Sequence, residues 1–251
     1  MTPNLLILGG TTEATALARA VAAAGITGVV SFAGRVARPL RQPLPQRVGG
    51  FGGPDGLARF LRDESISHVV DATHPFAAQM SRNAVDACAS ANLPLIALTR
   101  SPWHAQPGDR WTHVPDIPAA VQALDCAPRR VMLAVGRMHV AAFVANPQHF
   151  YLLRFVDPPQ EPLELPDAHI IVSRGPFIAA EDRALMQTHG IDLVVSKNAG
   201  GAGASAKIEA ARSLGLPVLM IDRPALPHRR EVATPDAVLK WLSHAGTDLG
   251  V

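Results

Sequence analysis

Two lysines stand in one short glycine-rich segment of this 251-residue chain, which carries most of its positive charge on arginine. The segment, residues 196–207, reads SKNAGGAGASAK, follows an apolar run and precedes a helical pattern. This order predicts a strand, a glycine-rich turn and a helix N-terminus. Because backbone N–H groups and ammonium groups would converge there, we expect Lys197 and Lys207 to meet an anion.

Arg137 and Arg174 carry a similar signal, because each follows a predicted strand and a small residue, as Lys197 does. In a parallel sheet the carboxyl ends of the strands lie at one edge, so these three cations would emerge together. Charge-assisted hydrogen bonds from them are worth about 1.5–3 kcal/mol each when partly desolvated. A single cation after a strand is usually a solubilising residue, but three in register predict a site for a multiply charged anion. Lys207 has no acidic residue at a helical ion-pair position, which favours the same role.

A second kind of chemistry is indicated near the N-terminus, where a strand runs into a helix through the turn Gly9, Gly10, Thr11, Thr12 and Glu13. Glycine lets the backbone approach a phosphate, and threonine hydroxyls can cap the helix or donate to phosphate oxygens. The turn is not a GxGxxG motif, and alone it fits cofactor binding and an ordinary capped turn equally well. Its place after the first strand favours a dinucleotide pyrophosphate.

The end of the second predicted strand lacks the acidic residue that would bind a ribose 2′-hydroxyl, and Ser31 and Arg35 stand there instead. A hydroxyl and a guanidinium suit a 2′-phosphate, which favours NADP over NAD. A solvated arginine is the alternative, since Arg38 and Arg41 follow closely.

The end of the fourth predicted strand is followed by Ala72, Thr73, His74 and Pro75. Small residues there would let a nicotinamide ring lie close to the backbone. Pro75 suits the first turn of a helix. His74 could donate a proton, but a histidine beside proline in a turn is at least as often structural.

These residues need an alternating framework, and the chain supplies one. Short apolar runs alternate with helical patterns, which is typical of an α/β fold with parallel strands. The first half predicts five strands, at 4–8, 28–32, up to 48, 68–71 and 95–98, with helices at 12–24, 54–63 and 75–91.

The second half predicts another α/β unit, with strands at 130–135, 150–153, 170–173, 192–196 and 217–221. A stretch rich in proline and tryptophan, residues 101–118, separates the halves. We therefore expect an N-terminal domain at 1–110 and a C-terminal domain at 111–251, and we find no sequence repeat between them.

Composition excludes several classes of function. With 48% hydrophobic and 18% charged residues the chain is globular, and no apolar run or leader indicates a membrane span or signal peptide, so we expect a cytoplasmic protein. A net charge of +2 and a single tyrosine argue against nucleic acid as a partner. Cys88 and Cys126 lie far apart, which predicts buried free thiols and no metal site.

Three segments of the chain resemble the hallmark segments of the precorrin-6A reductases of cobalamin biosynthesis. They are GGTTE at 9–13, DATHPFA at 71–77 and SKNAGG at 196–201, and their order and spacing fit essentially the whole chain. In two departures, Ala199 and Ala204 stand where members of the family can carry hydroxyl residues. The resemblance implies two Rossmann-like domains with mainly parallel sheets and an active site in the cleft between them.

The resemblance also implies NADPH-dependent reduction of precorrin-6A to precorrin-6B, by hydride transfer to C19 of the macrocycle. Its carboxylate side chains are the polyanion that the cations predict. On this basis NADPH is held by Gly9, Gly10, Thr11, Thr12, Glu13, Ser31, Arg35, Ala72, Thr73, His74 and Pro75. The substrate is held by Arg137, Arg174, Lys197, Asn198, Gly200, Gly201 and Lys207.

Lys197 is expected closest to the chemistry, where it would donate a proton, stabilise charge or anchor a propionate. The substrate can be metal-free precorrin or its cobalt counterpart, and hand-over to other cobalamin-pathway enzymes is a further expected interaction. One alternative is an NADPH reductase of another anionic substrate, although the Tyr-x-x-x-Lys pair of short-chain dehydrogenases is absent around Tyr151. The other is a non-catalytic dinucleotide-binding or tetrapyrrole-binding protein.

Overall fold

The computed structural model describes residues 3–33, 41–159 and 161–244. The chain divides into two compact units. The first unit combines Met1–Arg100 with Ala225–Val251, and the second is Ser101–Pro224. Among the described residues, no helix combines the length and apolar character that a membrane crossing requires.

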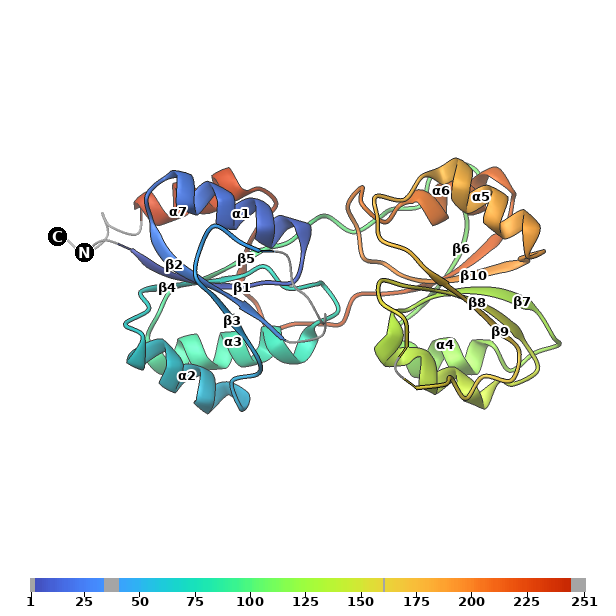
Figure 1. Cartoon of the computed structure of the whole chain (residues 1–251), viewed down its shortest axis with the longest axis horizontal. Helices are drawn as coiled ribbons and strands as arrows, with labels where there is room; N and C mark the ends of the chain where they lie inside the picture. The colour runs from blue at the N-terminus through green and yellow to red at the C-terminus, as the bar shows by residue number, and fades with distance from the viewer. Residues whose placement is uncertain (1–2, 34–40, 160, 245–251) are drawn as a thin grey trace. The chain divides into compact units, whose positions relative to one another are not determined.

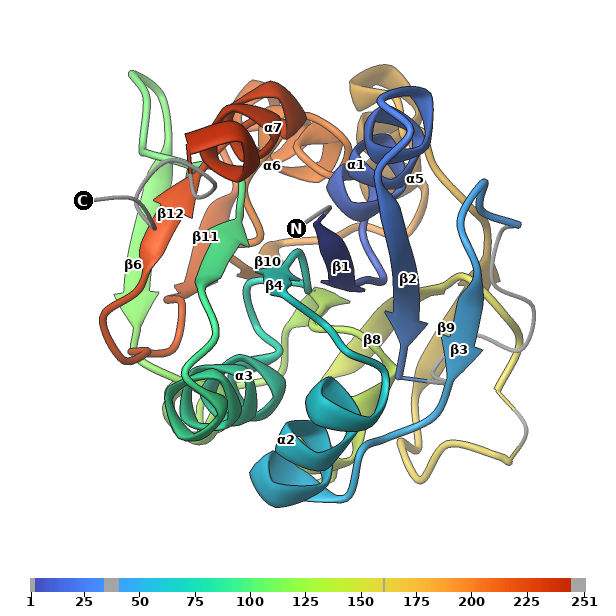
Figure 2. The same cartoon turned by 90° about the vertical axis from the view of Figure 1, so that its left-hand side faces the viewer.

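The first unit is a three-layer α/β sandwich around a six-stranded parallel sheet. Figure 1 shows α1 (Thr12–Ala23) and α7 (Pro235–His244) on one face, and α2 (Gly53–Asp63) and α3 (Ala78–Ala91) on the other. The strand order is β12-β5-β4-β1-β2-β3, with β12 and β3 at the edges (Figure 2). The strands are β1 (Asn4–Leu8), β2 (Thr27–Phe32), β3 (Gln46–Val48), β4 (His68–Asp71), β5 (Leu95–Leu98) and β12 (Arg230–Val232).

The central strand β1 is apolar because both of its faces are buried, as expected for a parallel sheet covered by helices. Leu5 and Ile7 pack in the cluster beneath α1 and α7. Leu6 and Leu8 pack in the opposite cluster, with residues of α2 and α3. All four are at most 1% exposed, so β1 anchors both cores and fixes where the turn that follows it emerges.

The second unit has the same architecture. Its parallel sheet has the order β6-β11-β10-β7-β8-β9. Helices α5 (Ala179–Thr188) and α6 (Ala206–Ser213) cover one face, and α4 (Ile117–Ala123) and the 3-10 helix η1 (Arg137–Ala145) cover the other (Figure 1). The strands are β6 (Arg110–Val114), β7 (Arg130–Ala134), β8 (Phe150–Phe155), β9 (Ala168–Val172), β10 (Leu193–Lys197) and β11 (Pro217–Ile221).

The two units share one strand plan, although their sequences show no repeat. In each, the first strand of the alternating series, β1 or β7, is central, two later strands extend the sheet on one side and three complete it on the other. This is the doubly wound Rossmann order. The predicted α/β fold with two Rossmann-like domains is therefore confirmed. The sixth strand of each sheet comes from outside its series: β6 follows β5 in sequence but joins the second unit, and β12 joins the first unit after the second is complete.

The division of the chain differs from the predicted domains 1–110 and 111–251. Residues 101–110 belong to the second unit and residues 225–251 to the first. The reason is long-range: β12 pairs with β5 from Arg230↔Ile96 to Val232↔Leu98, and α7 places Val238, Trp241 and Leu242 in the core beside α1. Loop composition does not reveal such a return.

Two local predictions were also wrong. Helix α3 begins at Ala78, so Pro75 lies in the preceding turn and not in the first helical turn. Cys126 is exposed, whereas Cys88 is buried as predicted. Burial, together with the charge of Asp71, raises the pKa of the Cys88 thiol to about 12. No group of three or more potential metal-binding side chains gathers in the described ranges.

A buried ion pair ties the returning C-terminal segment to the first unit. Asp71, at the end of β4, is 2% exposed and pairs with Arg229, which precedes β12. The same carboxylate accepts hydrogen bonds from Ser81 Oγ at 2.6 Å, from Thr73 Oγ1 at 2.6 Å and from Thr73 N at 3.1 Å. Every partner of this buried charge is therefore polar or cationic, which offsets its desolvation.

We predict that Arg229→Met destabilises the protein by about 3–5 kcal/mol, because it leaves the buried Asp71 carboxylate without its cation. Glu231→Gln is the matched control: Glu231 is 51% exposed and contacts the same arginine at 3.2 Å. Exposed pairs contribute about 1 kcal/mol or less. Urea unfolding measures both changes, and equal midpoints for the two variants would contradict the assigned role of the pair.

Candidate functional site

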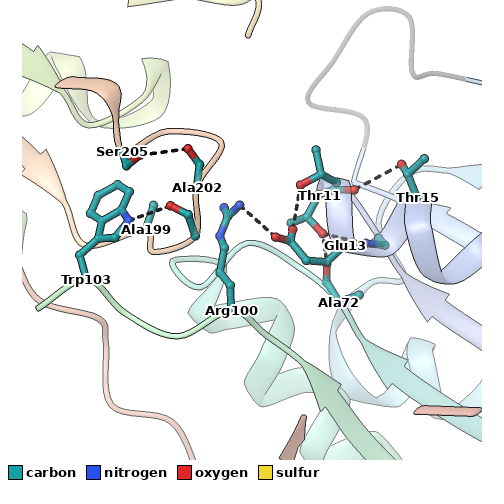
Figure 3. A network of polar contacts seen from close by, with 12 residues as sticks. Thr11, Glu13, Thr15, Ala72, Arg100, Trp103, Ala199, Ala202 and Ser205 are labelled. Carbon is teal, nitrogen blue, oxygen red and sulfur yellow. Dashed lines mark hydrogen bonds and ion pairs between the residues drawn. The ribbon is translucent and has the colours of Figure 1, made fainter. Parts of the chain in front are cut away.

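The first candidate site lies at the switch point of the first unit, between β1 and β4, where the strand order reverses and open α/β sheets bind ligands. Thr11 joins the two turns there. Its Oγ1 donates to the Ala72 carbonyl at 2.8 Å and accepts from Ala14 N at 3.1 Å, which caps α1 (Figure 3). The glycine-rich turn and the turn after β4 are thereby held as one surface.

The backbone around α1 fits a pyrophosphate. Gly9 N donates to Ser31 O at 2.8 Å, and Gly10 has φ +116°, a conformation that side chains rarely adopt. The N–H groups of Thr12 and Glu13 have no acceptor among the described residues. Such N–H groups, at the positive end of the helix dipole, bind phosphate oxygens. Gly9, Gly10, Thr11 and Thr12 therefore lie in the turn at the N-terminus of α1, and their contact with a nucleotide stays a prediction.

Glu13 forms an ion pair with Arg100. Its Oε1 lies 3.3 Å from Arg100 Nη1, and both side chains are mostly buried (Figure 3). Its Oε2 accepts from Thr12 Oγ1 at 3.1 Å. A carboxylate in the first turn of α1 would repel an anion, and the guanidinium offsets that charge. Arg100 was not predicted from the sequence, because nothing local to residue 100 indicates a partner at residue 13.

Ser31 is buried and bonded to an arginine that the sequence did not single out. Arg47 Nη1 donates to Ser31 Oγ at 2.8 Å, and β2 and β3 pair these two residues directly. Arg47 also donates to the carbonyls of Gly49 and Gly50 and stacks over Phe51, with 3.9 Å from its Cζ to the ring centroid. Burial lowers its pKa from the ordinary value. The predicted ligand Arg35 lies outside the described residues.

The turn after β4 is rigid for reasons that involve its own side chains. Asp71 holds Thr73 through both the backbone N–H and the hydroxyl. His74 Nδ1 accepts from Phe76 N at 3.2 Å, so this nitrogen shapes the turn. Ala72 is completely buried. These contacts support a structural role for the His74 ring, and its use as a proton donor stays a prediction.

The second candidate site lies at the switch point of the second unit, between β7 and β10. Arg137 begins η1 after β7 and is exposed, while Lys197 is the last residue of β10. Arg174 follows β9, two strands beyond β7 and about 10 Å away along the sheet edge. All these strands are parallel, so the prediction that the three cations emerge at one edge is confirmed. Arg174 is paired with Asp157 at 2.7 Å, which offsets part of its charge.

The glycine-rich loop after β10 is held by Trp103 and Arg223. Asn198 uses both ends of its amide on Trp103, accepting from its N at 2.8 Å and donating to its O at 3.0 Å. The indole N–H donates to Gly201 O at 2.8 Å. Arg223 donates to the carbonyls of Asn198 and Ala199, each at 3.0 Å. The Asn198 side chain therefore orders the loop.

Lys207 also has a structural task. Its ammonium donates to the Ala204 carbonyl at 2.7 Å and lies 4.8 Å from the centroid of the Trp103 ring. Ser205 Oγ donates to the Ala202 carbonyl at 3.1 Å, which closes the same turn (Figure 3). Lys207 thus stabilises the loop that follows Lys197, and its contact with a substrate stays a prediction.

The comparisons with known proteins agree with this arrangement. The family described as "Precorrin-6x reductase CbiJ/CobK" matches residues 4–243 of the chain. The chain belongs to this family of reductases.

Similar proteins cover almost the whole chain. It is 58% identical to the precorrin-6A reductase of Rhodobacter capsulatus, over 99% of each chain, and 48% identical to that of Sinorhizobium sp., over 96% of this chain and 93% of the other. The cobalt-precorrin-6A reductase of Priestia megaterium is 30% identical, over 95% and 97%. A solved structure, "CobK precorrin-6A reductase", superposes with a TM-score of 0.92 at 58% identity, covering 97% of both chains.

As a precorrin-6x reductase the protein is an oxidoreductase of cobalamin biosynthesis, and a nicotinamide dinucleotide is the cofactor that such a family uses. The position of Tyr151 differs from that of the catalytic tyrosine of a short-chain dehydrogenase. Tyr151 is fully buried, donates to the Asn146 carbonyl at 3.0 Å, and has its pKa raised by burial. It therefore serves packing and not proton transfer.

We predict that Gly200→Ala disrupts the loop of this reductase. Gly200 has φ +70°, and an added Cβ would lie 2.1 Å from Ser101 O and 2.4 Å from Arg223 Nη2. The strained backbone alone costs about 1–3 kcal/mol, and the contact with a backbone oxygen adds to it. Gly203→Ala is the control, because a Cβ there meets nothing within 4 Å. Thermal unfolding compares the two, and a Gly200→Ala protein as stable as Gly203→Ala would refute the steric argument.

Proposed function

We propose that the protein reduces precorrin-6A to precorrin-6B with NADPH, binding the nucleotide at the switch point of the first unit and the macrocycle at that of the second. The observation that carries the proposal is the pair of switch points: one is lined by glycine, hydroxyl and backbone N–H groups, the other by Arg137 and Lys197. Relatives that are 58% and 48% identical are named precorrin-6A reductases, which supports the metal-free substrate over the cobalt form.

In the first unit, the proposed task of the chain is to position the nucleotide. The α1 N-terminus and the Gly9–Gly10 backbone would bind the pyrophosphate, and Arg100 would keep Glu13 from repelling it. Bound NADPH supplies the hydride, which passes to C19 of the macrocycle. The Thr73 hydroxyl donates its proton to Asp71, so toward a bound group it would act as a hydrogen-bond acceptor.

At the 2′-phosphate, Ser31 and Arg47 are the proposed recognition pair, with Arg35 as the third candidate. Ser31 and Arg47 are joined at 2.8 Å at the carboxyl ends of β2 and β3, and no acidic residue stands at the end of β2. In Rossmann folds this position distinguishes NADPH from NADH.

In the second unit, Arg137, Arg174 and Lys197 would bind carboxylates along the sheet edge. Lys197 is the candidate for a proton donor or for stabilising charge on the macrocycle after reduction. An ammonium is a compact cation that can serve either as an anchor or as an acid, so the two roles must be separated by kinetics.

The proposal predicts that the purified protein oxidises NADPH when precorrin-6A is present, as followed by NADPH absorbance. Binding of both molecules without oxidation would contradict it and indicate a carrier. In the same assay, Lys197→Met is expected to lower kcat roughly 100-fold if the ammonium acts as an acid. An unchanged kcat with a raised KM would assign it to anchoring alone. Lys240→Met, an exposed lysine on α7, is the matched control.

A second prediction concerns cofactor choice. Arg47→Met is expected to weaken NADPH binding about 10- to 100-fold, the equivalent of losing one charge-assisted hydrogen bond, while NADH binding changes little. Titration of nucleotide fluorescence measures both affinities. Arg59→Met, an exposed arginine on α2, removes the same charge as a control, and Arg35→Met in parallel tests the other candidate. Equal losses for NADPH and NADH in Arg47→Met would rule out a role in phosphate recognition.

A further inference from the structure

Large apolar side chains that are exposed to solvent are concentrated in one part of the second unit. Among the described residues five such side chains stand out, and Val48 is the one that lies in the first unit. The others are Met138 at 67% exposed, Ile178 at 56%, Val172 at 50% and Val156 at 48%. An uneven distribution of this kind marks an interaction surface more often than scattered single residues do.

These four residues share a position in the fold. Met138 lies in the first turn of η1, which follows β7. Val156 comes directly after β8, and Val172 is the last residue of β9. Ile178 is the N-cap of α5, in the segment that follows β9. Because β7, β8 and β9 are parallel neighbours, the segments that carry these four residues leave the sheet at its carboxyl edge, where β7 and β9 are two strand spacings or about 10 Å apart.

The same edge carries alternating charge. Arg137 precedes Met138, and Arg174 stands between Val172 and Ile178 in the sequence. Asp157 follows Val156 and is paired with Arg174 at 2.7 Å. Apolar side chains are thus interleaved with guanidinium groups, of which one is partly neutralised. An occupant that fits has an apolar body and several anionic groups at its margin.

The segment beneath this surface is anchored. Arg154 on β8 forms an ion pair with the buried Asp182 of α5, and its Cζ lies 4.3 Å from the centroid of the Phe177 ring. Asp182 N also donates to the Ile178 carbonyl at 3.0 Å. The start of α5, and with it the backbone of Ile178, is therefore fixed to the sheet.

We infer that Met138, Val156, Val172 and Ile178 form the apolar wall that packs against the macrocycle, while the neighbouring guanidinium groups bind its carboxylates. The inference rests on the proposed function and extends it, since the cations alone would select charge and not ring shape. A conjugated ring with acetate and propionate side chains has the apolar body and the anionic margin that the edge requires. A second copy of the chain or another protein are the competing occupants.

The test uses substitutions that retain shape but add polarity, Met138→Gln and Val172→Thr, alone and combined. The KM for precorrin-6A is expected to rise roughly tenfold in the double variant, while kcat and the Kd for NADPH stay at the wild-type values. Val48→Thr is the matched control, because Val48 is 55% exposed in the first unit. Thermal unfolding confirms that the variants remain folded.

The outcomes separate the inference from the proposed function. If the wild-type protein fails to oxidise NADPH with precorrin-6A, the proposed function is wrong. If the wild type turns over and the double variant has an unchanged KM, the apolar wall is wrong and the function stands. Sedimentation of both proteins tests whether a second copy of the chain is the occupant. A wild-type dimer, together with a monomeric double variant whose KM is unchanged, would overturn the inference.

Discussion

Parallel pairing of the strands is the constraint on which the rest of this molecule depends. Every recorded pairing in both sheets is parallel, so the carboxyl ends of all strands in a unit lie at the same edge. Residues that are distant in sequence are therefore delivered to one place. In the first unit this edge gathers glycines and hydroxyls, and in the second it gathers cations and apolar side chains. Helices cover both faces of each sheet, so the central strands consist of apolar residues. Polar side chains that bind ligands are therefore found at the carboxyl edge.

Many charged groups at these edges serve to order the backbone. Arg229 compensates Asp71, Arg100 compensates Glu13, and Arg223 binds two carbonyls of the loop after β10. Each of the three arginines is near a point where the chain passes from one unit to the other, after residue 100 or after residue 224. Each reaches a residue within a switch-point turn or directly beside one. The connecting segments are thus bonded to the candidate sites.

Local patterns in the sequence were enough to predict the central strands and both switch-point turns, because apolar runs, glycines and capping residues act over a few neighbours. The edge strands β6 and β12 were missed because their sequences, RWTHV and REV, contain no run of apolar residues. Arg47, Trp103 and Arg229 were missed for another reason. Their importance comes from contacts with Ser31, Asn198 and Asp71, and these contacts form only when the chain folds. Single-chain periodicity carries no signal for them.

The positions of β6 and β12 in the sequence determine the order in which the two sheets can be completed during synthesis. The second unit is one continuous stretch and contains every strand of its sheet by residue 221, whereas the first unit gains β12 and α7 from residues that are translated after the second unit. Until then, Leu5, Ile7 and Leu17 lack the cover that Val238, Trp241 and Leu242 provide. During synthesis the first unit therefore begins to emerge before the second, but it cannot be completed until β12 and α7 have been translated.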